Sequence, residues 1–131
     1  MPQPTALISK KIRFDANGGT ISISLEFDTL LIGTYLLQLR EANGNAVVME
    51  KIGDNTNAED DVFPLPTPAR LNDNRTLWIF ITLIDQTGDG GDYEVRVKTS
   101  QDDQILDTLS SGQKTIQAPS ESIIFVSRLL T

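Results

Sequence analysis

The sequence of 131 residues contains no histidine and no cysteine. These two side chains supply most general-base, nucleophilic and transition-metal chemistry near neutral pH. Their absence excludes Ser-His-Asp and Cys-His catalysis, thiolate zinc sites and iron–sulfur ligation. Aromatic residues are also few, with one Trp, two Tyr and five Phe, which leaves little for stacking against sugars. We therefore expect a non-catalytic protein without a cofactor. One alternative function, given below, would use calcium.

Basic residues are outnumbered, since 11 Lys and Arg stand against 18 Asp and Glu, for a formal net charge of −7. This balance opposes binding to nucleic acid, whose phosphates attract clustered Lys and Arg. No run approaches the roughly 18 apolar residues of a membrane span, and the N-terminal lysines follow a short apolar pair, unlike those of a signal peptide. We expect a cytoplasmic protein, although the mature form of a secreted protein would read the same.

Period-two alternation of apolar and polar residues dominates the chain. Thr20–Asp28 places Ile21, Ile23, Leu25 and Phe27 on one face, and Tyr93–Thr99 repeats the pattern. Such segments are half-buried strands of an antiparallel sheet. About eight short strands, with turn signals every 8–12 residues or so, predict an all-β, antiparallel two-sheet β-sandwich, jelly-roll or immunoglobulin-like. A closed barrel is the alternative architecture. We find one domain, residues 1–131.

Glycine-containing turns separate several of these strands. Asn43-Gly44-Asn45 lies between Thr34–Ala42 and Ala46–Ile52 and predicts a β-hairpin, because Asn and Gly accept positive φ. By the same reasoning Asn17-Gly18-Gly19 and Gln86–Asp92 predict two further hairpins. Helical periodicity is weak throughout. The best candidate, of one or two turns, is Asp103–Leu109.

Two segments are apolar on both faces. Leu77–Ile81 is rich in β-favouring residues, so we expect a central strand covered on both sides. Ser122–Leu130 is similar and runs almost to the last residue, where chains usually fray. It is therefore either a central core strand or an element that pairs across a subunit interface.

The interface alternative leads to the main functional prediction. The chain is expected to be a structural or protein-binding module that forms a homo-oligomer or a subunit of a larger assembly, using main-chain pairing at a sheet edge. The apolar side chains assigned to this interface are Ile123, Ile124, Phe125, Val126, Leu129 and Leu130.

An acidic loop supports a different function. Residues 85–92 hold three carboxylates, those of Asp85, Asp89 and Asp92, together with three glycines. Calcium takes six to eight oxygen ligands, and loops at one end of a β-sandwich can supply them. The alternative prediction is a calcium-dependent module for glycans or lipid head groups. Glycine and aspartate are also favoured in any solvated turn, and the spacing is not that of an EF-hand.

Overall fold

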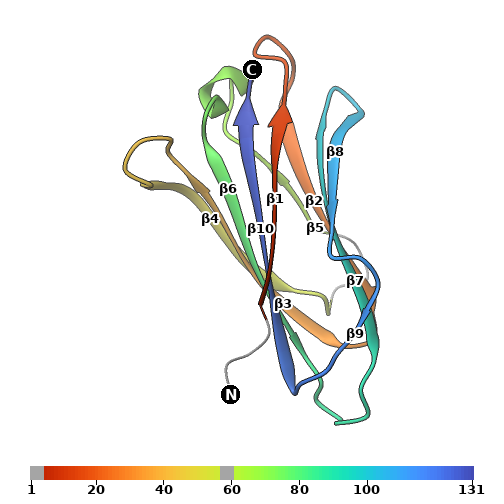
Figure 1. Ribbon diagram of the computed structural model, residues 1–131. Coiled ribbons are helices and arrows are strands. Elements are labelled where there is room, and N and C mark those ends of the chain that lie inside the picture. The colour runs from red at the N-terminus through yellow and green to blue at the C-terminus, as the bar shows by residue number, and fades with distance from the viewer. Residues whose placement is uncertain (1–4, 57–60) are drawn as a thin grey trace.

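The computed structural model describes residues 5–56 and 61–131, which form two packed five-stranded sheets and one short 3-10 helix, Ala69–Asn72 (Figure 1). The first sheet has the order β1 (Thr5–Arg13), β10 (Ser120–Leu130), β6 (Thr76–Ile84), β3 (Ile32–Arg40), β4 (Val47–Asp54). The second has the order β5 (Asp61–Pro64), β2 (Ile21–Thr29), β7 (Asp92–Gln101), β8 (Gln104–Ser110), and β9 (Lys114–Thr115) also pairs with β7. Within these ranges no helix is long and apolar enough to cross a membrane.

The prediction of an all-β two-sheet sandwich is confirmed, with two differences in detail. The described residues form ten strands rather than about eight, and the first sheet is mixed, because β1 runs parallel to β10. These two strands are the ends of the chain, so everything between them serves as the crossover that a parallel pair needs. Alternation along a strand shows which face is buried but not the direction of its neighbour, so the sequence could not reveal this pairing.

The core forms where the alternating apolar side chains of the two sheets meet. From β2 it takes Ile21, Ile23 and Leu25, and from the centre of the first sheet Ile79 and Phe125, all at most 1% exposed. β6 is central as predicted, between β10 and β3. The prediction that β6 is covered on both sides was wrong, because Trp78 and Phe80 on its outer side remain partly exposed.

Two of the three predicted hairpins do not exist. The turn at Asn43-Gly44-Asn45 does join the antiparallel pair β3–β4, with φ of 82° at Gly44 and 55° at Asn45. The turns at residues 17–19 and 86–92 instead pass from the first sheet to the second, from β1 to β2 and from β6 to β7. Positive-φ residues suit any tight reversal, so their presence does not decide whether the flanking strands share a sheet.

The predicted helical turns at Asp103–Leu109 were also wrong. This segment lies in β8, which pairs antiparallel with β7 from Arg96 to Gln101. Asp102 and Asp103 both have positive φ, 53° and 63°, and form the tight turn between the two strands. The main-chain partner offered by β7 outweighs the weak helical pattern of the segment, as tertiary context commonly does.

Candidate functional site

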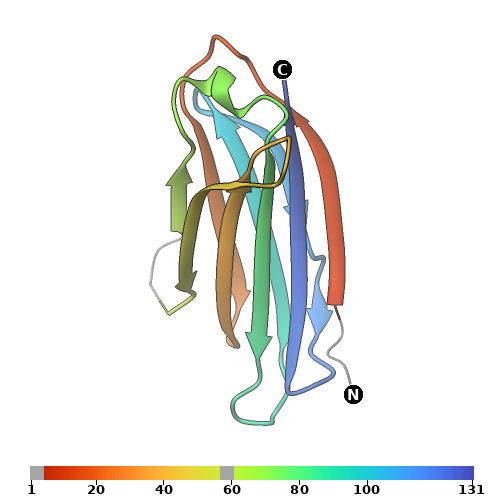
Figure 2. The ribbon, with the colours of Figure 1, turned by 90° about the vertical axis from the view of Figure 1, so that its left-hand side faces the viewer.

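The outer face of the first sheet carries an unbroken row of apolar side chains, one from every strand. In register order across the sheet they are Leu7, Ile124, Phe80, Leu36 and Ile52. Figure 2 looks onto this sheet, with β10 and β6 between β1 and the β3–β4 pair. Leu7 is 66% exposed and Ile52 76%, while the other three are half-buried. An apolar stripe therefore crosses the whole width of a solvent-facing sheet.

Val126 and Trp78 widen this stripe by one row on β10 and β6, where they are register partners. The Trp78 ring stacks on that of Phe80, with centroids 6.0 Å apart. The guanidinium carbon of Arg40 lies 4.7 Å from the Trp78 ring centroid, a cation–π contact. We call the set of Leu7, Leu36, Ile52, Trp78, Phe80, Ile124 and Val126 the apolar face.

The outer face of the second sheet has the opposite character. Glu26 on β2 accepts from Arg96 at 3.1 Å and from Lys98 at 2.8 Å, and Arg96 also reaches Glu94 at 3.2 Å. The Lys98 ammonium, with a smaller contribution from Arg96, holds the pKa of the Glu26 carboxyl below its usual value. An antiparallel sandwich normally presents charged residues of this kind to water on each outer face, so the apolar face of the first sheet requires an explanation.

A hollow of about 470 Å³ lies at one end of the apolar face. In Figure 2 the turn between β3 and β4 passes in front of β6 here, and Asn45 from this turn lines the hollow. The other lining residues come from β1, β6 and β10: Ser9, Lys10, Lys11, Thr76, Trp78, Val126 and Arg128. Lys11 and Arg128 are direct register partners, and no Asp or Glu is among the lining residues.

The predicted interface residues of β10 divide between the two faces of the sheet. Ile123, Phe125 and Leu129 point into the core and are at most 1% exposed. Ile124, Val126 and Leu130 alternate with them and lie on the outer side, partly exposed. Both edges of the strand are occupied, one by β1 and the other by β6. Main-chain pairing of β10 with another chain is therefore not available, and only the outward side chains can meet a partner.

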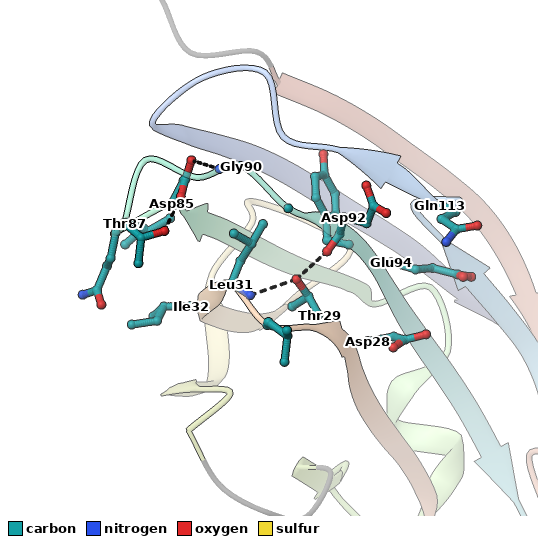
Figure 3. Close-up of a pocket in the computed structure, with 15 residues that line it drawn as sticks. Asp28, Thr29, Leu31, Ile32, Asp85, Thr87, Gly90, Asp92, Glu94 and Gln113 are labelled. Carbon is teal, nitrogen blue, oxygen red and sulfur yellow. Dashed lines mark hydrogen bonds between the residues drawn. The ribbon is translucent and has the colours of Figure 1, made fainter.

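The predicted calcium ligands lie where β6 connects to β7: Asp85 directly follows β6, Asp89 is in the turn, and Asp92 is the first residue of β7. Figure 3 shows Asp85 and Asp92. Asp85 accepts from the backbone N–H groups of Gly88 and Gly90, both at 3.0 Å. Asp92 accepts from the Thr115 hydroxyl at 2.6 Å, and the Asp89 N–H donates to Thr87. Across residues 5–56 and 61–131 no three acidic side chains are grouped so that they could hold a metal ion. The structure thus gives Asp85 and Asp92 loop-stabilising contacts, and calcium binding stays a prediction.

The hollow drawn in Figure 3 is larger, about 630 Å³, and lies between the β2–β3 and β6–β7 turns. Asp28 and Glu94, register partners on β2 and β7, line it together with Asp85 and Asp92. Its inner wall includes Tyr93, whose hydroxyl donates to Glu121 at 2.9 Å. Burial, then the hydrogen bond to the Glu121 carboxylate, raises the pKa of Tyr93 to about 12. Tyr93 and Glu121 form a structural pair inside the sandwich.

Sequence reasoning found only Ile124 and Val126 of the apolar face, because its members come from five strands that are separated along the chain. A weak signal was present, since Leu36-Leu37 and Leu7-Ile8 place apolar residues at both parities of their strands. No family model, curated protein or solved structure matches this chain.

Proposed function

We propose that this chain is a non-catalytic β-sandwich that works by binding protein, and that a second copy of the chain occupies its apolar face. The observation that carries the proposal is the row of five apolar side chains across the outer face of the first sheet. Burying such a row against a matching surface is favourable, at about 25 cal/mol for each Å² removed from water.

The dimensions of the face suit an isologous dimer. Five strands at a spacing of about 4.8 Å, each near nine residues long at about 3.3 Å per residue, give a plan area of roughly 700 Å². A standard protein–protein interface buries about 800 Å² on each partner. In a two-fold dimer the same patch serves both copies, so one apolar row covers the other.

The charges around the apolar face also favour a second copy. Lys11 and Arg128 lie at the β1 side of the sheet, whereas Glu50 and Asp54 lie on β4 at the opposite side. A face with one basic and one acidic side is complementary to itself, which matters in a chain whose net charge of −7 otherwise opposes contact between copies. The tips of the face, Leu7 and Ile52, are more than half exposed in the isolated chain.

The test is the absolute mass in solution, by light scattering after size exclusion in buffer with a chelator, over a range of concentrations. Wild type should run as a discrete oligomer above the 14.4 kDa monomer. Leu7→Asp and Ile52→Asp should each shift it to monomer, because an unpaired carboxylate in a buried contact costs about 3–5 kcal/mol, a hundredfold or more in affinity. Both side chains lie on edge strands at exposed positions, so the monomer should stay folded.

Matched controls exist on the second sheet. Val62 on β5 and Ile105 on β8 are also apolar, on edge strands, and 58% and 60% exposed. Val62→Asp and Ile105→Asp should leave the oligomer intact. A monomeric wild type at every concentration would reject self-association, and equal effects of all four substitutions would reject the apolar face as the contact.

A further inference from the structure

Lys11 and Arg128 form a pair of neighbouring cations that has no carboxylate partner among the described residues. They are directly opposite each other on β1 and β10. Within the described ranges, the ion pairs use Lys10, Arg75, Arg96 and Lys98, and neither Lys11 nor Arg128 takes part in one. Like charges at directly opposite positions repel and destabilise a strand pair. In a chain of net charge −7, two such cations side by side create a local attraction for an anion.

The hollow beside these cations supplies further donors and an apolar floor. Asn45 lines it from the β3–β4 turn, and its apolar lining residues, here called its floor, are Trp78 and Val126. The indole Nε1 of Trp78 is the one buried side-chain nitrogen or oxygen atom, over residues 5–56 and 61–131, that has no hydrogen-bond partner. A buried donor without an acceptor is rare in folded proteins. Cationic donors above an apolar floor match an anionic group carried on an apolar body.

The size of the hollow decides between small and large ligands. Its volume of about 470 Å³ falls within the range of small-molecule pockets, about 300–1,000 Å³. A carboxylate can be held by Lys11 and Arg128 together, since a guanidinium binds it with two parallel hydrogen bonds. An aliphatic tail would then lie on Val126 and Trp78 and point along β10 toward Ile124.

We propose that this hollow binds a carboxylate attached to an aliphatic chain, with Lys11 and Arg128 holding the carboxylate and Trp78 and Val126 the chain. The hollow shares Trp78 and Val126 with the apolar face, so a bound ligand and a second copy would compete for these side chains. Ile52, at the far edge of the apolar face, does not line the hollow. The Ile52→Asp variant therefore permits a test of ligand binding in the monomer.

The chain's single tryptophan is Trp78, so intrinsic tryptophan fluorescence reports on the surroundings of this one side chain. We would titrate the Ile52→Asp protein with decanoate and follow Trp78 emission, with decanol and acetate as probes that lack the charge or the tail. Decanoate should give a saturable change. Decanol should bind at least tenfold more weakly because it lacks the charged acceptor, whose hydrogen bonds are worth about 1.5–3 kcal/mol. Acetate should also bind at least tenfold more weakly, because it lacks the aliphatic chain that would be removed from water.

The decisive comparison uses two double variants with the same loss of charge. Lys11→Gln with Arg128→Gln should weaken decanoate binding by about a hundredfold, on the same basis of about tenfold for each cation. Lys51→Gln with Arg70→Gln removes one Lys and one Arg at exposed positions outside the hollow and should change nothing. The proposal is overturned if decanoate gives no saturable change, if decanol binds as tightly, or if both double variants weaken binding equally. A wild type that proves monomeric would reject the proposed function and leave this result standing.

Discussion

Two adjacent residues of β10 should separate folding from association. Phe125 is 0% exposed and pairs in register with Ile79 of β6 and Ile8 of β1. Ile124 points to the opposite side of the sheet, within the apolar face. Phe125→Ala and Ile124→Ala therefore truncate neighbouring side chains with different surroundings.

The expected loss of stability follows from the burial of each side chain. A buried Phe removes about 150 Å² or more of apolar surface from water, worth about 4 kcal/mol at 25 cal/mol per Å². Measured Phe→Ala costs in protein cores, about 3–5 kcal/mol, agree with this value. Ile124 is partly exposed already, so its truncation should cost about 1 kcal/mol in the monomer.

Urea unfolding followed by circular dichroism measures these differences, and light scattering on the same samples measures association. Phe125→Ala should lose more stability than Ile124→Ala. At temperatures where it remains folded, it should have the mass of the wild-type oligomer. Ile124→Ala should lose only about 1 kcal/mol of stability and should dissociate at a higher protein concentration than wild type. Equal losses of stability in the two variants would refute the assignment of opposite faces, and dissociation of Phe125→Ala alone would refute the apolar face as the contact.

Three further outcomes follow from the polar contacts. Burial raises the pKa of Tyr93 to about 12 and that of Tyr35 above its ordinary value, and these are the chain's two tyrosines, so ultraviolet absorbance should show no tyrosinate in the folded protein near pH 10. In the unfolded chain both phenols lose their protons at about pH 10, before those of the folded protein do. The stability that the two protonated phenols contribute is therefore complete below about pH 10 and declines as the pH rises toward 12. Urea unfolding at several pH values would detect this decline, and normal titration of both phenols in the folded protein would contradict it. Asp85→Ala should lower the unfolding temperature, because the N–H groups of Gly88 and Gly90 lose their acceptor, at a cost of about 1–2 kcal/mol. Under the proposed function, millimolar calcium should leave the wild-type unfolding temperature unchanged. A rise that Asp89→Asn and Asp92→Asn abolish would instead support the calcium alternative.

Much of the fold could be predicted because side-chain alternation reports directly on burial. Ile21, Ile23 and Leu25 alternate with polar residues, and each is buried in the structure. What alternation lacks is information on which strands pair. The glycine turns at residues 17–19 and 86–92 look like hairpin turns, yet each joins strands of different sheets. That choice depends on packing of the whole core, which no short segment encodes.

The candidate site was harder to predict for the same reason. The acidic loop attracted attention because its residues are adjacent in the sequence. In the structure the Asp85 carboxylate stabilises the turn after β6, and the Asp92 carboxylate accepts from Thr115 across the β7–β9 pair. The apolar face has no such local signature, since Leu7 and Ile52 become parts of one row only through four successive pairings among five strands.

The apolar run at the C-terminus therefore has a different meaning in the structure from either of its sequence interpretations. A central strand buried on both sides explains Ile123 and Phe125 but leaves Ile124 and Val126 facing outward. An interface strand that pairs by its edge is ruled out for the described residues by β1 and β6. The inner residues of β10 serve the core, whereas its outer residues continue a row that begins on β1 and ends on β4. Because that row belongs to the sheet, substitutions at its two ends test the interface without disturbing the strand that first suggested it.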